Sequence, residues 1–167
     1  ISTFQTKTDE KTRATALFSG GCFWCMQPPF DHLIGKGVIS TKVGYSGGNK
    51  INPTYKEVSA GHTGHREVIE VVYDPRVINY SQLLDVFWKN IDPFDDIGQF
   101  CDKGEQYKSA IFYHNDTERK SAEMSQQELI KEYGFKQKWA TDIIPAKDFY
   151  AAEEYHQNYY KKNPVRY

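Results

Sequence analysis

The sequence predicts an α+β fold of the ferredoxin-like type, a two-layer sandwich in which an antiparallel sheet carries its helices on one face. Strand-like and helix-like segments follow the order β-α-β-β-α-β between residues 14 and 113. Hydrophobic residues make up 39% and aromatic residues 15% of the 167 positions, which is enough for one core. We therefore expect one domain over residues 14–167, preceded by a flexible arm over residues 1–13 that is rich in Thr and charge.

The first half of the chain predicts three strands and two helices. Apolar or β-branched runs that end at Gly or Asp-Pro are typical of strands. A Pro pair makes the first helix irregular, whereas the second has a continuous apolar stripe. A long Gly-rich loop is expected over residues 46–65. The expected elements are strands over Ala14–Ser19, Val38–Tyr45 and Glu67–Tyr73, with helices over Phe23–Ile34 and Tyr80–Ile91.

The second half begins with another irregular loop, expected over residues 92–105. Asn115 or Asp116 is suited to cap a charged helix that stops at Gly134. Two long loops around a rigid scaffold are good places for a functional site. The expected elements here are a strand over Ser109–Tyr113, a helix over Thr117–Tyr133, a strand over Thr141–Ile144 and an extra C-terminal helix over Ala151–Lys161.

Composition excludes several classes of function. Lys plus Arg is 21 and Asp plus Glu is 22, so a net charge of −1 gives no general attraction to nucleic acid or anionic membranes. The longest stretch without Asp, Glu, Lys or Arg contains Gly and Pro pairs, which argues against a membrane span. We expect a monomer, because no partner surface is obvious. The start at Ile1 leaves the compartment open, with the cytoplasm as the default expectation.

Cys22 is the first residue that could carry chemistry. It follows a strand and two Gly residues at the point where a helix is expected to begin. Free backbone N–H groups and the helix dipole stabilise a thiolate at that position. The alternative is that Cys22 is a small buried apolar residue.

Cys25 completes a C-x-x-C pattern with Cys22. This spacing suits a redox pair at a helix start, and it also suits half of a metal site. The other half would have to come from Cys101, His62 or His65, a set that matches no standard zinc spacing. Packing on the inner face of the helix is the simpler alternative.

Glu67 is the most informative carboxylate. It shares one face of its predicted strand with Ile69, Val71 and Tyr73 because side chains alternate along a strand. If that face is covered, burial raises the carboxyl pKa and suits Glu67 to be a general acid. If the strand starts later, Glu67 is solvated instead.

Tyr55 lies in the first long loop and Tyr107 at the end of the second, shortly after Asp102. A loop Tyr can present its O–H to a polarised oxygen. With 12 Tyr in the chain, packing is the more common use of any one of them. Asp102 alone is typical of a solvated loop residue.

Gly21-Cys22-Phe23-Trp24 resembles the signature of the A-type peptide methionine sulfoxide reductases. Further pieces follow in the family's order, and the resemblance covers the chain from about Ala14 onward. These pieces are Gly44-Tyr45-Ser46-Gly47-Gly48, Asn52-Pro53-Thr54-Tyr55, Gly64-His65-Arg66-Glu67, Val72-Tyr73-Asp74-Pro75, Phe87-Trp88, Asp102-x-Gly104-x-Gln106-Tyr107 and His156-Gln157-x-Tyr159.

The resemblance implies thiol-dependent reduction of the S epimer of methionine sulfoxide, free or in proteins, through a Cys22 sulfenic acid. It implies that no metal or organic cofactor is needed and that thioredoxin or another dithiol is the reductant. By analogy Cys22 is the nucleophile and Glu67 protonates the sulfoxide oxygen. The remaining implied roles are oxygen binding by Tyr55 and Tyr107, assistance by Asp102, and an apolar substrate wall from Phe23 and Trp24 with Tyr159 nearby.

The chain departs from the commonest family pattern in two ways. Many relatives have Gly and Glu where this chain has Cys25 and Gln27, and many carry a resolving Cys in a C-terminal tail that does not follow Tyr167 here. A missing tail or an external thiol is the first expectation for resolving the sulfenic acid, then Cys25, then Cys101. Cys25 ranks below them because a helical i, i+3 pair needs local unwinding to form a disulfide.

Two other functions stay open from the sequence. A thiol–disulfide oxidoreductase could be built on Cys22 and Cys25, although it would not need Glu67 or the two Tyr residues. A structural or binding module that depends on a metal is the third possibility.

Overall fold

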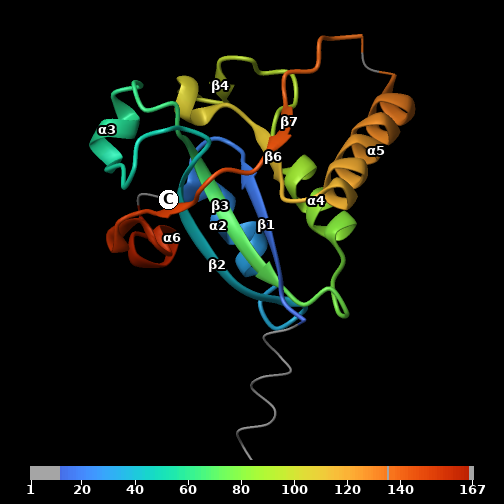
Figure 1. Cartoon of the computed structure of the whole chain (residues 1–167), viewed down its shortest axis with the longest axis horizontal. Coiled ribbons are helices and arrows are strands. Elements are labelled where there is room, and N and C mark those ends of the chain that lie inside the picture. The colour runs from blue at the N-terminus through green and yellow to red at the C-terminus, as the bar shows by residue number, and fades with distance from the viewer. Residues whose placement is uncertain (1–11, 135, 166–167) are drawn as a thin grey trace, which may run out of the picture.

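The computed structural model describes residues 12–134 and 136–165, and a six-stranded sheet in the order β7-β6-β1-β3-β2-β8 forms its centre (Figure 1). Residues 1–11 of the predicted arm lie outside the described residues. The central strands pair antiparallel in the order β6-β1-β3-β2, whereas β7 joins β6 in parallel, so the sheet is mixed. The six strands are β1 (Ala14–Ser19), β2 (Val38–Ser46), β3 (Arg66–Tyr73), β6 (Ala110–Tyr113), β7 (Asp142–Pro145) and β8 (Tyr150–Ala151).

Two helices cover one face of the sheet, α2 (Phe23–Asp31) and α4 (Tyr80–Lys89), and α5 (Asp116–Tyr133) packs on α4. In the core beneath them the Phe18 ring stacks on Phe30 and Phe87, with centroid distances of 5.6 and 5.1 Å. The predicted β-α-β-β-α-β order is therefore present from β1 to β6. Every strand and helix predicted in that part exists, with ends that shift by up to three residues.

The alternation predicted for β3 is confirmed. Ile69, Val71 and Tyr73 belong to the core under α2 and α4, whereas Val68 packs on the opposite face. That opposite face is covered by the C-terminal chain, which crosses the sheet toward β8 (Figure 1) and packs Phe149 near Val68. Both faces of β3 are thus buried.

The predicted C-terminal helix over Ala151–Lys161 is wrong. The segment instead forms β8, a 3₁₀ turn η2 (Glu154–His156) and a short helix α6 (Tyr159–Lys162). Ala152 donates its N–H to the Val43 carbonyl on β2, which holds the chain extended there. Asn158 has φ 54° and ψ 37°, a left-handed conformation that interrupts a helix.

The two long loops contain short elements that the sequence analysis left as loop. The first holds α3 (Tyr55–Ser59), which begins with a capping box between Thr54 and Glu57. The second holds a hairpin of β4 (Gly98–Gln99) and β5 (Asp102–Lys103), followed by the 3₁₀ turn η1 (Glu105–Tyr107). Among the described residues, no helix has both the length and the apolar character to cross a bilayer.

Candidate active site

The site is built on the start of α2. Cys22 is the N-cap residue, and its carbonyl accepts hydrogen bonds from the Cys25 N–H at 3.0 Å and the Met26 N–H at 3.2 Å. Gly21 precedes it with φ +86°, and a Cβ at Gly21 would lie 2.6 Å from the Gln99 Cβ. Only Gly fits there, so the β4–β5 hairpin packs directly against the turn that presents Cys22.

Glu67 approaches the same helix start from β3. Its side chain is buried, with 2% of the residue exposed, and Oε1 accepts the Phe23 N–H at 3.1 Å. Burial raises the Glu67 pKa to about 8; the bond from Phe23 opposes the shift, whereas the charges of Asp102 and Cys25 add to it. Glu67 is therefore protonated at neutral pH. The alternative of a solvated Glu67 is wrong, because β3 already starts at Arg66.

The two thiols of the C-x-x-C form a hydrogen-bonded pair. Cys22 is half-buried and donates its S–H toward the exposed Cys25. That bond, burial and the charges of Cys25 and Glu67 raise the pKa of Cys22, opposed by the Trp24 N–H. The same bond lowers the pKa of Cys25 to about 7 against the effects of burial and Asp102. Near neutral pH the pair therefore shares one negative charge, which lies mainly on Cys25. The S–H of Cys22 stabilises that charge by donating a hydrogen bond to it.

Two Tyr residues face the thiols and Glu67. Tyr55 is the first residue of α3 and Tyr107 the last of η1, and their hydroxyls are hydrogen-bonded to each other. Burial first, and then the Glu67 charge, raises the pKa of both phenols. Both phenols therefore stay protonated near neutral pH and can donate hydrogen bonds beside Cys22.

Asp102 and Cys101 are adjacent in sequence but differ in their relation to the site. Asp102 on β5 contributes its charge to the pKa of Glu67, Cys25 and Tyr107, so it lies at the site. Cys101 is exposed in the hairpin turn and is not among the groups that shift the pKa of Cys22 or Cys25.

Aromatic side chains border the site on the helix side. Trp24 is half-buried and stacks on Tyr159 from α6, with centroids 3.8 Å apart and planes at 7°. Phe23 is 1% exposed and packs on Tyr45 at 5.8 Å, so its ring is a buried support rather than an open wall. The structure brings Trp24 and Tyr159 together as one flat apolar surface.

Among the described residues, no further ligands lie where they could complete a metal site with Cys22 and Cys25. The His65 ring accepts the Gly48 N–H at Nδ1 and donates from Nε2 to the Lys50 carbonyl at 2.7 Å, so it fastens the loop. Over residues 12–134 and 136–165, no group of three or more His, Cys, Asp or Glu side chains is arranged to hold a metal ion.

Sequence reasoning missed one member of the site and gave another no role. Glu153 accepts the Tyr45 hydroxyl at 3.0 Å and the Tyr55 N–H at 3.2 Å, which ties α3 to the C-terminal chain. No signal in the sequence marked it. His156 accepts the indole N–H of Trp24 at 2.9 Å; its motif with Gln157 and Tyr159 was recognised without a function.

The arrangement has a defined chemical capacity. A thiol pair that shares one charge supplies a nucleophile, a neutral carboxyl supplies a proton, and two phenols donate hydrogen bonds. Such a set suits attack on an electrophilic atom that carries a poor oxygen leaving group, because the oxygen must be protonated before it departs.

Comparisons with known proteins agree with this chemistry. Residues 14–167 match the family model described as peptide methionine sulfoxide reductase. Peptide methionine sulfoxide reductase MsrA of Bacillus licheniformis is 52% identical over 155 residues, which cover 93% of this chain and 84% of that protein. The crystal structure of reduced Mxr1 from Saccharomyces cerevisiae is similar with a TM-score of 0.87 and 36% identity, over 94% of this chain and 89% of that one. Mxr1 in complex with Trx2 is similar with a TM-score of 0.63 and 25% identity, over 90% and 87%.

Proposed function

The chain belongs to the peptide methionine sulfoxide reductase family and reduces methionine sulfoxide in protein repair, and on that premise we propose how its own residues perform the reaction. The Cys22 sulfur attacks the sulfoxide sulfur while its proton passes to Cys25, whose pKa of about 7 suits it to accept. Glu67 gives its proton to the sulfoxide oxygen. The oxygen leaves the substrate sulfur for Cys22, so methionine departs and Cys22 becomes a sulfenic acid.

The phenols of Tyr55 and Tyr107 hold the sulfoxide oxygen as it gains negative charge. Burial and the Glu67 charge raise the pKa of both phenols, which keeps both as O–H donors in that position. Asp102 sustains the raised pKa of Glu67. Trp24, backed by Phe23 and stacked on Tyr159, receives the substrate methyl group. Because the oxygen, methyl group and attacking sulfur would have one fixed order around the substrate sulfur, this placement should accept a single epimer, and the family resemblance implies that it is the S epimer.

Cys25 resolves the sulfenic acid in this proposal. Cys22 is the N-cap residue, so its backbone is extended and already outside the helix, at φ −59° and ψ 118°. The unwinding that ranked Cys25 low from the sequence is thus smaller than expected, since Cys22 lies outside the helix and its thiol is hydrogen-bonded to that of Cys25. Cys25, which holds the proton it accepted from Cys22, attacks the Cys22 sulfur and passes that proton to the departing hydroxyl, so that water leaves and a disulfide forms. A dithiol such as thioredoxin then reduces it by exchange, and the complex of Mxr1 with Trx2 supports this choice.

Mass mapping after one equivalent of methionine sulfoxide tests that recycling route. A dominant Cys22–Cys25 disulfide supports it. A Cys22–Cys101 disulfide, or a persistent sulfenic acid that only external thiol removes, contradicts it and restores the alternatives.

A thiol–disulfide exchange function has one observation in its favour, the lowered pKa of the exposed Cys25. Cys25→Ser separates the two functions. Sulfoxide reduction with dithiothreitol that is slowed by loss of the proton acceptor but not abolished, together with lost turnover with thioredoxin, supports the reductase with Cys25 as the resolving residue. Loss of both activities with the fold intact favours the exchange function.

One observation carries the proposal, the buried Glu67 carboxyl that accepts the N–H of Phe23, the residue that follows Cys22. Chiral chromatography of racemic blocked methionine sulfoxide, incubated with enzyme and dithiothreitol, is the test. Consumption of the S epimer alone, abolished by Cys22→Ser, is expected. Consumption of both epimers would contradict the fixed order of groups. Full activity in Cys22→Ser would show that Cys22 is not the nucleophile.

The same proposal covers the architecture of the whole unit. The order β6-β1-β3-β2 with α2 and α4 on one face supports a ferredoxin-like core, to which β7, β8 and α6 are added. Residues 14–167 would act as one catalytic domain. A monomeric state stays a prediction.

A further inference from the structure

His156 is a buried imidazole in which one ring nitrogen is hydrogen-bonded and the other has no partner among the described residues. It is 1% exposed, and its Nδ1 lies 2.9 Å from the Trp24 Nε1. Its Nε2 is buried and has no hydrogen-bond partner among the residues that the structure describes. Buried polar atoms without a partner are uncommon, and each calls for an explanation.

The contact with Trp24 fixes which nitrogen of His156 holds the proton. An indole N–H can only donate, so the Nδ1 of His156 must accept and cannot itself be protonated. The proton of the neutral ring is then on Nε2. A doubly protonated ring could not accept the indole N–H at all, so this contact exists only while His156 is neutral.

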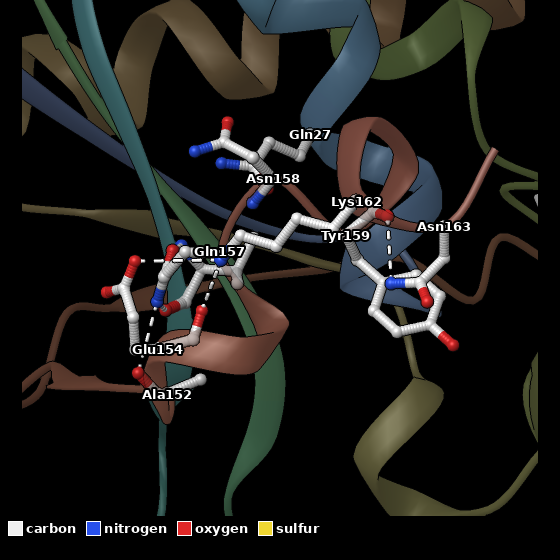
Figure 2. Close-up of polar contacts among 9 residues, drawn as sticks. Gln27, Ala152, Glu154, Gln157, Asn158, Tyr159, Lys162 and Asn163 are labelled. Carbon is white, nitrogen blue, oxygen red and sulfur yellow. Dashed lines mark hydrogen bonds and ion pairs between the residues drawn. The ribbon is translucent and has the colours of Figure 1, made fainter.

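The backbone on the C-terminal side of His156 is fastened to the rest of the fold. The buried Gln157 accepts the Val43 N–H at 2.9 Å and donates to the Val43 and Ala152 carbonyls. Asn158 donates its N–H to Gln27 of α2 at 2.9 Å, and Figure 2 shows these two side by side. His156 is therefore held in place independently of Trp24, whereas Trp24 is only half-buried.

The same imidazole touches three residues that the proposed function uses. Its centroid lies 5.1 Å from that of Phe23, 5.6 Å from that of Trp24 and 4.5 Å from that of Tyr55. Tyr159 holds one flat face of Trp24 by stacking, and His156 holds the indole N–H. Together these two contacts restrain the indole ring, one on its flat face and one at its N–H.

We propose that His156, as a neutral imidazole protonated on Nε2, is a positioning residue that locks the Trp24 ring in the orientation that receives the substrate methyl group. It acts through Trp24 and takes no part in the chemical step. This inference rests on the proposed function for the role of Trp24, but the hydrogen bond itself can be tested without activity. Substrate binding, rather than the reaction of bound substrate, should depend on it.

The surroundings of His156 keep it neutral near pH 7. Burial lowers its pKa, and the Glu153 carboxylate opposes that shift. The ionisable rings that face it, Tyr55 and Tyr155, have raised pKa values and stay uncharged. As the pH falls through the lowered pKa, His156 becomes protonated, Trp24 is released, and the KM for the sulfoxide rises.

Two substitutions separate positioning from packing. His156→Asn places an amide oxygen where Nδ1 was, so it keeps an acceptor for the indole N–H, whereas His156→Phe keeps a ring and removes the acceptor. His156→Phe is expected to raise the KM for blocked methionine sulfoxide about tenfold with kcat changed less than twofold, as for a buried donor left unpaired. His156→Asn should have a KM close to that of the wild type, and its KM should not rise as the pH falls.

A double-mutant cycle with Trp24→Phe, which removes the donor, gives the coupling. His156→Phe should cause no further rise in KM when Trp24 is already Phe. Equal effects of His156→Phe in both backgrounds, or a loss confined to kcat, would overturn the positioning role.

Nitrogen-15 NMR of the wild-type protein tests the hydrogen bond even if a variant fails to fold. The Nε2–H form of His156 and a Trp24 indole proton that exchanges slowly with solvent are expected at pH 7, both lost together on acidification. An Nδ1–H form, or an indole proton indifferent to His156 protonation, overturns this inference. Loss of reductase activity in Cys22 variants bears only on the proposed function.

Discussion

The helices α2 and α4 cover the same face of the sheet but begin in opposite ways. At α4, Asn79 accepts the Gln82 N–H and Gln82 accepts the Asn79 N–H, both at 2.9 Å, so the helix start is closed by its own side chains. At α2 the N-cap residue is Cys22, whose side chain makes no capping bond. The N–H of Phe23 is bonded instead by Glu67, which comes from a neighbouring strand.

The difference separates a helix start that is closed by its own side chains from one that, in the proposed mechanism, takes part in the chemistry. A side-chain cap stabilises a helix by about 1 kcal/mol, and α2 lacks it while also containing Pro28 and Pro29. The uncapped position is what places a thiol at the positive end of the helix. Glu67 then replaces the cap by accepting the Phe23 N–H, and in the proposed mechanism the same carboxyl supplies a proton to the substrate. Stability at this end of the molecule comes from packing instead.

Glu67→Gln is expected to have the largest effect. The amide keeps an acceptor for the Phe23 N–H but cannot protonate the sulfoxide, so single-turnover reduction should slow by about 100-fold or more while the fold is retained. Rapid-quench measurement with circular dichroism checks both. A rate near that of the wild type would remove Glu67 from the acid role.

Glu118→Gln is the matched control. Glu118 is also buried, at 8% exposure, but it lies in the first turn of α5, far in sequence from the thiols. Its carboxylate accepts the His114 N–H from the residues that precede the helix. Its single-turnover rate should stay within twofold of the wild type, with a stability loss of about 1 kcal/mol in urea unfolding. A large loss of rate would mean that any buried carboxyl change disturbs the site.

The pH dependence gives the next effect. Glu67 has a pKa raised to about 8, so it is protonated below that value and loses the proton as the pH rises through it. Single-turnover reduction should therefore fall about tenfold for each pH unit above 8, provided that the thiol pair already carries its charge. The stability sign is the same: the folded state favours the protonated carboxyl, so stability declines between the ordinary pKa of 4.5 and about 8. A rate that rises without limit to pH 10 would contradict this.

Tyr55→Phe and Tyr107→Phe should each slow single turnover about tenfold. The loss is smaller than for a lone oxyanion donor, because the two hydroxyls bond to each other and one remains when the other is removed. The double variant should lose more than the product of the single effects. Additive effects would show that the phenols act independently.

The smallest effects test the two helix starts directly. Asn79→Ala should lower the free energy of unfolding by about 1 kcal/mol without changing the rate, because it opens the α4 cap. Cys22→Asn should do the reverse at α2, raising stability by about 0.5 kcal/mol while turnover is abolished. Urea unfolding measures both. A Cys22→Asn protein less stable than the wild type would show that Cys22 contributes to folding.

Much of this arrangement was predictable from the sequence because it depends on local patterns. The alternation in β3 predicts that Glu67 shares a face with Ile69, and the structure confirms it. The Gly pair before Cys22 predicts a helix start there, which is also confirmed. Both features were predictable because the two-residue period of a strand and the residues that start a helix are local patterns that span only a few positions.

The rest depends on contacts between distant segments. Ala151–Lys161 has helical composition, but the bond of Ala152 to Val43 and the left-handed Asn158 override it. Glu153 and His156 join the site only because this chain crosses the sheet to reach α2 and α3. The contact of the Cys22 and Cys25 thiols likewise required the N-cap conformation of Cys22, which spacing alone does not show.

Carbon-13 NMR titration of the Glu67 carboxyl, assigned with Glu67→Gln, tests the central claim that this open helix start holds a proton for the reaction. The predicted result is a single transition at about pH 8, so that Glu67 is protonated at pH 7. A transition near the ordinary value of 4.5 would mean that Glu67 is an anion at neutral pH and cannot be the acid.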